Sequence, residues 1–529
     1  MLYWSLYCVF SLDTLFFNGI NRKFRLLFLL VLLIGSLLLS EWFHQIFTLK
    51  NAYRRRVTLS ILLQMLLMLA LFLIVFPGSW SWDDVAVLEY AKDYRFHGFQ
   101  HFLTSLYLIL CLYFIPSAAG ATAMQAILLS VLSGWVIVKV EDGYLEGLSL
   151  FGKLLLRPAF FLPPILFHNY LFFRNVVCAY TELALLVYAA VAARRSLRWK
   201  DLFLLSGFTA LLASWRSENI YYLPFFFLYL IFAGRKKKEK KTDEPSGCSS
   251  LRQSGFRQLS VRLLIFMLVC GLVLSVGKYN NHVIGSNNYS VLTSACPGLA
   301  LYREARTEPE RNEKELAAIE KVLNEETIDA NPDAGGAQLY WMSDFVNSYT
   351  DGEYSDYLLA ILRLIFRYPG TFLGERWKLF KDALGVNSEQ VMYVKDTILM
   401  FREDPAFRET SGYASVTDEM PLFPELREKL MLFAGNLRED LSFTSAHYIV
   451  WNLIPPMLFL IIGCIVFFIR KWYPEAFCLF AVLCKIPILF LTEPASFFMY
   501  YISVYLIGYF LLFSALASRL QRKNLRKNL

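Results

Sequence analysis

Long apolar runs separated by short polar breaks dominate the chain. Many of them reach the ~20 residues that a helix needs to cross the ~30 Å hydrocarbon core of a bilayer. Every backbone N–H and C=O inside lipid needs an internal partner, so these runs predict helices, and the alternating pattern of a membrane β-barrel is absent. The best-marked spans are residues 25–41, 58–77, 102–117, 122–139, 174–193, 260–277, 448–469, 475–492 and 497–517.

Shorter apolar runs and one proline-rich run extend this pattern. The shorter runs, residues 2–19, 201–214 and 220–234, bring the total to about twelve spans. Residues 158–173 contain Pro158, Pro163 and Pro164, which interrupt a helix and favour a re-entrant or interfacial segment. We therefore predict an all-α polytopic membrane protein with about twelve transmembrane helices.

Residues 280–447 interrupt the apolar pattern. They are polar and too long for a connection between spans, so we expect a folded extracytoplasmic domain that is α-rich, with α/β as the alternative. Residues 308–326 have helical spacing, with apolar side chains on one face. The chain then divides into an N-terminal transmembrane domain of about nine spans (1–279), this insert, and a C-terminal transmembrane domain of about three spans with a basic tail (448–529).

Basic clusters set the expected topology, because Lys and Arg gather on the cytoplasmic side of a membrane. The clusters are Arg54–Arg56, Arg194–Lys200, Arg235–Lys238, Arg470–Lys471 and Arg519–Lys527. Counted along the spans they all fall on one side, which places the C-terminus in the cytoplasm. The opposite side then receives residues 77–101, 140–173, 215–220 and 280–447. Arg22, Lys23 and Arg25 also fall outside, against the rule.

Composition and charge agree with a membrane protein. Charged residues make up 18% of the chain, below the roughly 25% of soluble domains. The net charge of +8 lies in the clusters at helix ends, not in a patch with interleaved aromatic residues, which argues against a nucleic-acid partner. Residues 235–257 are polar and basic and predict a flexible cytoplasmic linker. The nine cysteines are scattered, without metal-ligand spacing.

Two adjacent carboxylates, Asp83 and Asp84, stand in the outer loop at residues 77–101. Crowding by a like charge and partial desolvation raise a carboxyl pKa, which suits one of them to act as a general base. The pair could equally hold a divalent cation. Trp82 could stack on a sugar ring or anchor the membrane interface. The alternative for the pair is an acidic loop in which one aspartate caps the next helix.

His97 and His101 stand one helical turn apart at the start of the next apolar run. No third ligand accompanies them, which disfavours a metal site. At the depth of the lipid headgroups, His101 suits contact with a phosphate. A polar helix end is the alternative.

Other charged residues lie at membrane depth, where a charge needs a partner or a function. Arg216 and Glu218 lie between two short runs, either as a local pair or with Arg216 as ligand of a lipid-linked phosphate. Lys485 lies inside a span, where it would meet a phosphate or pair with a carboxylate such as Glu182.

Further charges border the proline-rich segment. Arg157 and Arg174 bracket it and could hold an anionic headgroup. The residues expected at the outer end of the span at 122–139 are Lys139, Glu141, Asp142 and Glu146.

With these residues in place, the chain resembles the GT-C superfamily of integral membrane glycosyltransferases, and most of all bacterial members with a Pro-Gly segment and an aspartate after an early span. The resemblance rests on the acid pair, a histidine that begins the next helix, Arg216 between short spans, and the stretch Tyr368–Arg376 (YPGTFLGER). Many relatives carry an Arg-Tyr pair before the last span, where this chain has Phe498–Tyr501. Arg216, Lys485 and Arg376 are the candidates to replace it.

The resemblance implies sugar transfer from a polyprenyl-phosphate-linked donor to an extracytoplasmic glycan, lipid or protein acceptor, in a bacterial cytoplasmic membrane. Asp83 or Asp84 would deprotonate the acceptor hydroxyl. Some relatives use Mg²⁺ or Mn²⁺, so the same two aspartates are also candidate metal ligands. The residues that would bind the donor's phosphate or sugar are His97, His101, Arg216, Glu218, Lys485, Arg376 and Trp82.

Two other functions fit the same layout. A polymer ligase of the O-antigen type also has about twelve spans and a large outer loop. It would use Arg and His in that loop, whereas the insert here has only His282 and His447, both at its edges. A lipid or polysaccharide transporter or flippase is the non-enzymatic alternative. It predicts internal repeats, which the sequence does not show.

Overall fold

The computed structural model describes residues 17–98, 100–195, 197–232, 248–284, 289–340, 342, 344–385, 392–399, 416 and 419–527. In these ranges the chain is almost entirely helical, and β structure is limited to isolated bridges. The prediction of an all-α protein is therefore confirmed for the described residues. The predicted span at 2–19 and the linker at 235–257 fall largely outside them. From Cys248 onward, the linker is already part of a helix.

Two compact units make up the chain. Unit 1 consists of Met1–Gly285, Val391–Lys485 and Tyr501–Leu529, and unit 2 of Ser286–Gln390 and Ile486–Tyr500. The limits of these units are set by contacts within the fold. The limits predicted from the sequence, at 279/280 and 447/448, are set by where the chain changes from apolar to polar, so the two divisions describe different properties. The polar stretch that begins at Val391 packs with the apolar helices of unit 1.

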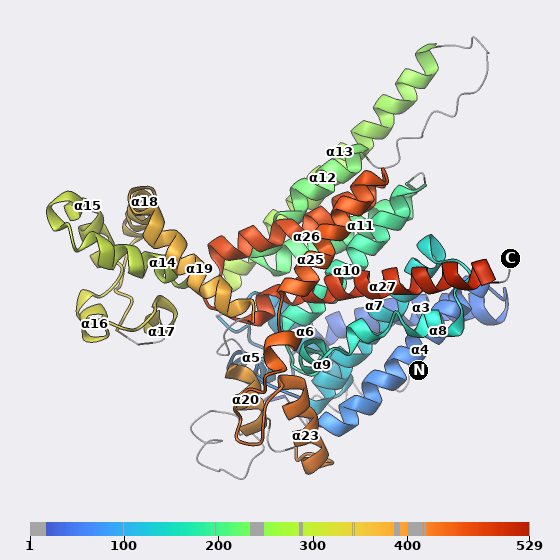
Figure 1. The fold of residues 1–529 in the computed structure, drawn as a ribbon, viewed down its shortest axis with the longest axis horizontal. Helices are drawn as coiled ribbons and strands as arrows, with labels where there is room; N and C mark the ends of the chain where they lie inside the picture. Colours follow the sequence, from blue (N-terminus) through green and yellow to red (C-terminus); the bar gives the residue numbers. More distant parts are fainter. Residues whose placement is uncertain are drawn as a thin grey trace. The chain divides into compact units, whose positions relative to one another are not determined.

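Unit 1 contains all the long apolar helices (Figure 1). Its elements are α3 (Arg22–Phe47), α4 (Ala52–Val75), α5 (Trp82–Lys92), α6 (Phe102–Phe114), α7 (Ala118–Tyr144), α8 (Leu150–Leu154), η1 (Pro158–Phe160), α9 (Pro163–Asn169), α10 (Arg174–Ala193), α11 (Trp199–Trp215), η2 (Ser217–Asn219), α12 (Tyr222–Phe232), α13 (Cys248–Ile284), α20 (Met392–Leu399), α23 (Pro424–Gly435), α24 (His447–Val450), α25 (Ile454–Ile469), α26 (Tyr473–Thr492) as far as Lys485, and α27 (Ile502–Lys527).

Unit 2 is a small helical body with its own core. Its elements are α14 (Tyr289–Ala305), α15 (Pro309–Glu320), α16 (Glu325–Ala330), α17 (Gly336–Tyr340), α18 (Asp351–Arg367), α19 (Pro369–Ala383), the last turns of α26, and most of η4 (Phe498–Tyr501). Thr350 and Glu353 form a capping box that fixes the start of α18. Tyr302, Ile319 and Leu364 lie in the core at 0% exposure.

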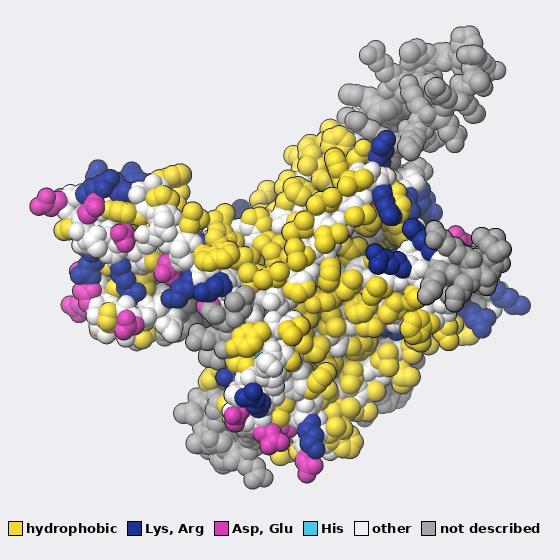
Figure 2. Space-filling view, in the orientation of Figure 1, with side chains coloured by type: hydrophobic (Ala, Val, Ile, Leu, Met, Phe, Trp, Pro, Cys, Tyr) yellow, Lys and Arg dark blue, Asp and Glu magenta, His cyan; other side chains and the backbone are white. Residues whose placement is uncertain are grey.

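Eight described helices are long and apolar enough to cross a membrane, as expected of a multi-pass membrane protein. They are α3, α4, α7, α10, the apolar part of α13, α25 with the turn before it, α26, and α27 with the turn before it. Figure 2 shows a broad hydrophobic surface over α13, α25 and α26. Such a surface requires lipid in place of water. The runs predicted as spans at 102–117, 201–214 and 220–234 form the shorter helices α6, α11 and α12.

The helices of unit 1 run between two ends that contacts identify. The basic end carries Arg56, which pairs with Asp142 at 2.7 Å, and Arg194, which pairs with Glu475 at 2.7 Å. The Asp83 end carries the turn after α4, where Arg427 donates to the carbonyl of Gly78 at 3.0 Å. In Figure 2, Lys and Arg side chains gather where α11, α13 and α27 approach the basic end.

The acidic residues at the end of α7 lie at the basic end, and their expected position at the outer end of a span is wrong. Glu141 forms an ion pair with Lys153 at 2.7 Å. Glu141 and Asp142 both form ion pairs with Arg56. The reason is that α6 does not run between the two ends. His101, before α6, lies near Arg174, and Ser117, after it, caps α7 at the Asp83 end.

The proline-rich segment, by contrast, runs from one end of unit 1 to the other. Lys153, just before it, lies at the basic end, and Tyr170, near its end, bonds to Ser79 at the Asp83 end. The helical stretches Leu150–Phe160 and Pro163–Asn169, which include most of this segment, are bent by 70°. Asn169 Nδ2 donates to the carbonyl of Phe160 at 2.9 Å, which satisfies a backbone group freed at the bend. This geometry is that of a broken span.

Candidate functional site

Two chain segments meet at the Asp83 end and bring the starts of α5 and α10 together. The Ser79 N–H donates to the carbonyl of Tyr170 at 2.8 Å, and the Phe172 N–H donates to the carbonyl of Ser79 at 3.2 Å. Trp80 is fully buried and stacks on Phe172 with ring centroids 5.3 Å apart. Asp83 and Arg174 follow directly on these two segments, so the pairing places both side chains at the same end of unit 1.

Gly78 makes this turn possible. Its φ of 108° lies in the region that favours glycine, and a Cβ there would lie 2.7 Å from the Thr122 side chain of α7. The turn is also covered by the polar stretch of unit 1. Arg427 is buried and donates to the carbonyl of Gly78, while Ser79 Oγ contacts the sulfur of Met431 at 3.7 Å. Nothing in the sequence predicted that this stretch would cover the turn.

The two aspartates occupy different environments in the first turn of α5. Asp84 is buried and accepts a hydrogen bond of 2.6 Å from the hydroxyl of Ser81, the residue at the N-cap. Asp83 is half-buried and has no such bond among the described residues. The alternative in which one of the aspartates caps the helix is therefore wrong, because the N-cap residue of α5 is Ser81. Burial raises the pKa of Asp83, and it raises the pKa of Asp84 further.

Arg174 is the positive charge that acts on both aspartates. Its guanidinium lowers the pKa of both carboxyls and so offsets part of the effect of burial. It acts on His101 as well: burial and Arg174 together lower the pKa of His101 to about 4. Among the described residues, no carboxylate lies within the 4.0 Å of an ion pair with Arg174. Asp83, Asp84, His101 and Arg174 thus form one electrostatic group, which we call the Asp83 site.

His101 presents a hydrogen-bond donor in this group. Its Nδ1 accepts from the Leu103 N–H at 3.3 Å, which assigns the proton of the neutral ring to Nε2. That Nε2 is buried and has no partner in the described part of the chain. A buried donor of this kind favours an acceptor such as a phosphate oxygen.

Two buried ion pairs lie deeper in unit 1. Lys485 of α26 pairs with Glu182 of α10 at 2.8 Å and also donates to Ser503 at 3.0 Å. The Tyr222 hydroxyl donates to the other oxygen of Glu182 at 2.6 Å. The structure therefore gives Lys485 the carboxylate partner that the sequence offered as one of two possibilities.

Arg216 and Glu218 form the second pair, on either side of Ser217 after α11. Burial alone would raise the pKa of Glu218, but Arg216 and Lys485 outweigh it and lower this pKa. The two pairs are therefore electrostatically coupled. This cluster of Glu182, Lys485, Arg216 and Glu218 is called the ion-pair cluster below.

Helix α10 and a row of aromatic rings connect the two groups. Cys178, one turn after Arg174, lies within electrostatic range of Arg174, Arg216 and Lys485. The indole Nε1–H of Trp215 donates to the hydroxyl of Thr104 of α6 at 3.0 Å. Four aromatic rings follow one another from the loop at residues 77–101 to Arg216, in the order Trp80, Phe172, Tyr107 and Trp215. The centroids of neighbouring rings are 5.3, 5.2 and 5.6 Å apart. The candidate residues of unit 1 thus gather along one side of α10.

Three other predicted site residues have different surroundings. Trp82 is 50% exposed and stands directly before Asp83 on the chain. The His97 ring meets the edge of Tyr90 at 4.8 Å, and burial lowers its pKa. Arg376 belongs to unit 2, where it is fully buried and donates to the carbonyl of Glu493 at 2.6 Å. These contacts make Arg376 part of the packing of unit 2.

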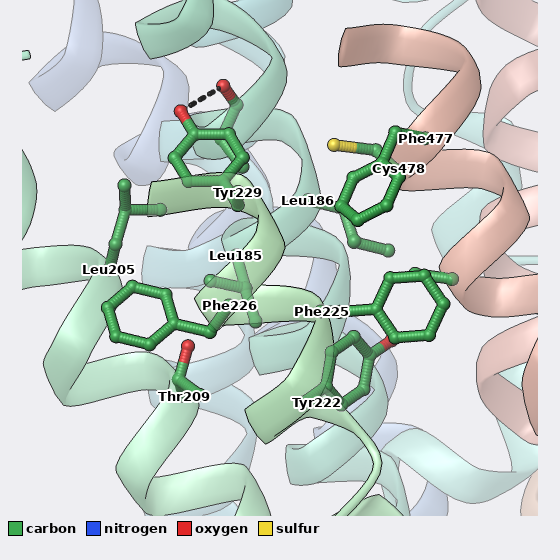
Figure 3. A pocket seen from close by; sticks show the side chains of 12 residues that line it. Leu185, Leu186, Leu205, Thr209, Tyr222, Phe225, Phe226, Tyr229, Phe477 and Cys478 are labelled. Atoms are coloured by element: carbon green, nitrogen blue, oxygen red, sulfur yellow. Dashed lines mark hydrogen bonds between the residues drawn. The ribbon is translucent and has the colours of Figure 1, made fainter. Parts of the chain in front are cut away.

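An apolar pocket opens between α10, α11, α12 and α26, farther toward the basic end than the Asp83 site (Figure 3). In Figure 3 the ring of Phe226 lies beside Leu205 and Thr209, while the ring of Phe225 lies on the other side of the pocket, with its centroid 5.0 Å from that of Phe477. Leu185 stands eleven residues after Arg174 on α10, a rise of about 16 Å at ~1.5 Å per residue. Tyr222 lines the pocket and also bonds to Glu182, so the pocket adjoins the ion-pair cluster. Such a pocket suits a hydrocarbon chain.

The donors for a divalent cation are few. Among the described residues, no group of three or more His, Cys, Asp or Glu side chains is arranged to hold a metal. The Asp83 site supplies two carboxylates, of which one is engaged by Ser81, and Arg174 adds a positive charge. This donor set does not fit a resident Mg²⁺ or Mn²⁺.

Comparison of the chain with protein-family models, curated proteins and solved structures finds no match.

Proposed function

We propose that this protein is a membrane glycosyltransferase that moves a sugar from a polyprenyl-phosphate-linked donor to an acceptor hydroxyl at the extracytoplasmic face. The observation that carries the proposal is the Asp83 site, in which a half-buried carboxyl of raised pKa lies within electrostatic range of Arg174, and Arg174 in turn lies within range of His101. A base and an anion-binding group side by side meet the two needs of transfer from a phosphate leaving group.

Asp83 is the base in this proposal. Its carboxylate takes the proton of the acceptor hydroxyl as the hydroxyl oxygen bonds to the anomeric carbon. The bond from that carbon to the phosphate oxygen breaks, and the polyprenyl phosphate leaves with the electron pair. Asp84 is the poorer choice, because it is buried and already bonded to Ser81. Burial raises its pKa further than that of Asp83, and the charge of Asp83 adds to this rise, so Asp84 is the carboxyl of the pair that holds a proton.

Arg174 and His101 bind the departing phosphate. Negative charge grows on the phosphate as the sugar leaves, and a guanidinium placed there in advance stabilises that charge. The Nε2–H of a neutral His101 donates a hydrogen bond to the same group. Arg174 thereby takes the role that the resemblance offered to Arg216, Lys485 or Arg376. Arg216 and Lys485 already have buried carboxylate partners, which supports this assignment.

The membrane setting suits a lipid donor. The aromatic pocket beside the ion-pair cluster is a place for part of the prenyl chain, and Trp82 is available to stack on the sugar. In this proposal the basic clusters and the C-terminus are cytoplasmic, so the Asp83 end lies outside. No step in this mechanism needs a metal ion.

The proposal predicts a pH dependence. A protonated Asp83 cannot accept a proton, so the rate should fall as the pH falls through the pKa of Asp83. Burial raises this pKa, so the fall should begin at a higher pH than for an ordinary aspartate. Rates of transfer from a short-chain prenyl-phosphate sugar by the full chain in nanodiscs, measured across the acid range, test this. A rate that stays constant down to the ordinary aspartate range contradicts Asp83 as the base.

Replacing Arg174 by glutamine should change two quantities together. The KM for the prenyl-phosphate sugar should rise, because the phosphate loses a charged ligand. The acid limb of the pH profile should move to higher pH, because Arg174 lowers the pKa of Asp83. Arg95→Gln is the matched control, since Arg95 is 62% exposed and its side-chain contacts among the described residues are an ion pair with Asp93 and stacking on Tyr90. An unchanged pH profile in Arg174→Gln would remove Arg174 from the site.

A further inference from the structure

Helix α18 of unit 2 has two apolar faces, and only one of them is used by the core. The buried face consists of Tyr357, Ala360, Ile361 and Leu364. The second face consists of Leu358, Leu359, Leu362 and Phe366, all exposed, with Phe366 at 79%. At about 100° per residue, each set falls within an arc of about 100° on the helix. A soluble helix needs one apolar face, so the second requires an explanation.

The next helix continues this exposed apolar surface. Leu373 and Trp377 stand one turn apart on α19, and they are 50% and 56% exposed. Only Tyr368 separates α18 from α19, and the two helices are in contact. Figure 2 shows hydrophobic side chains together with basic ones over these two helices. We call the exposed apolar side chains of both helices the α18–α19 face.

Helix α19 is attached to the end of a membrane-spanning helix. Phe380 packs edge-on against Phe490, with ring centroids 5.5 Å apart. Arg376 donates to the carbonyl of Glu493, just after the end of α26 at Thr492. Cys296 of α14 contacts the carbonyl of Pro494 at 2.8 Å. All three contacts lie within unit 2, which therefore packs on the last turns of the candidate span α26.

We propose that the α18–α19 face lies on the bilayer, among the lipid headgroups and upper acyl chains of the leaflet in which α26 ends. Trp377 neighbours Arg376 and thus stands within one helical turn of the end of the span, at the depth that tryptophan prefers. Exposed Arg363 and Lys378 stand beside the apolar side chains, where they meet lipid phosphates. A helix with an apolar face and a basic border is typical of an interfacial helix.

Lipid is the occupant that these observations favour over a protein. The end of α26 already lies at a lipid surface, and unit 2 is joined to it, so lipid reaches this face without any further partner. The proposal does not depend on the reaction catalysed at the Asp83 site. It assigns unit 2 a second point of attachment to the membrane, besides its chain connections.

The test uses the full chain in nanodiscs of phosphatidylcholine and phosphatidylglycerol. A spin label is attached to a cysteine introduced as Phe366→Cys or Trp377→Cys, and the signal of natural thiols is measured on the unaltered protein and subtracted. Asp356→Cys is the matched control, because Asp356 is an exposed residue of α18 outside both apolar faces. The collision rate with oxygen, relative to that with a water-soluble nickel chelate, should be several-fold higher at residues 366 and 377 than at residue 356.

Equal ratios at all three positions overturn the proposal, since the face would then be in water. Labels shielded from both oxygen and nickel overturn it too, because a protein would cover the face; dipolar broadening would identify a second copy. A further variant keeps the test independent of one label. Phe366→Glu with Trp377→Glu leaves the core of unit 2 intact and should raise nickel access at Leu362→Cys several-fold. An unchanged nickel access there also contradicts membrane contact.

Discussion

Asp83→Asn is expected to slow sugar transfer by about 10²- to 10⁴-fold, the range that a positioned general base contributes. Asparagine keeps the size of the side chain but cannot take a proton from the acceptor. Asp83 is half-buried and lacks the hydroxyl partner that Asp84 has, so the change should leave the fold intact. The measurement is the rate of transfer by the purified protein in nanodiscs, with release of prenyl phosphate as a second readout.

Two further variants complete this experiment. Glu89 lies on the same helix, is 51% exposed and pairs, within the described part of the chain, with Lys92, so transfer by Glu89→Gln should be unchanged. Asp84→Asn should reduce transfer less than Asp83→Asn, because Asp84 is buried and bonded to Ser81. A larger loss in Asp84→Asn would exchange the roles of the two aspartates. A normal rate of transfer by Asp83→Asn, with the protein inserted in the nanodisc membrane, would contradict the proposed reaction.

Lys485→Met is expected to lower the free energy of unfolding by about 3–5 kcal/mol, the cost of leaving one partner of a buried ion pair alone. Glu182 is fully buried, and its oxygens bond to Lys485 at 2.8 Å and to Tyr222 at 2.6 Å. Without the ammonium group the carboxylate keeps only the tyrosine. Equilibrium unfolding of the purified protein in mixed micelles, followed by circular dichroism, measures the change.

The double variant Glu182→Gln with Lys485→Met separates a structural pair from a ligand site. Removing both charges should recover most of the lost stability, because no buried charge remains unpaired. The exposed Lys200→Met should change the free energy of unfolding by no more than about 0.5 kcal/mol. If the double variant is as unstable as Lys485→Met alone, the pair is not the reason that Lys485 matters, and a role in donor binding returns.

The sequence predicted the helices of this protein well, because apolar length and periodicity are local properties. Runs of about 20 apolar residues became α3, α4, α7, α10, α25, α26 and α27. The basic clusters at residues 54–56 and 194–195 do lie at one end of unit 1, as the count of spans required. Yet that agreement had two compensating errors. Helix α6 was counted as a crossing, and the proline-rich segment was not.

Both errors have the same physical cause. A run of 13 apolar residues, as in α6, rises about 20 Å, less than the ~30 Å of hydrocarbon, so apolarity alone does not decide whether it crosses. Prolines break hydrogen bonds inside a helix, but a neighbouring amide can replace them, as Asn169 does for Phe160. Whether a segment crosses depends on what holds its two ends, and these partners are distant in sequence.

For the candidate site too, the sequence predicted individual residues but not the contacts between them. The sequence by itself singled out Asp83, Asp84 and His101, because charged residues at the edge of apolar runs are rare and costly. Only the tertiary structure joined them to Arg174, through the Ser79–Tyr170 hydrogen bond between segments 91 residues apart. Only the tertiary structure gave Lys485 its partner, across 303 residues. Local sequence fixes which residues are charged and helical, whereas the long-range contacts decide which charges meet.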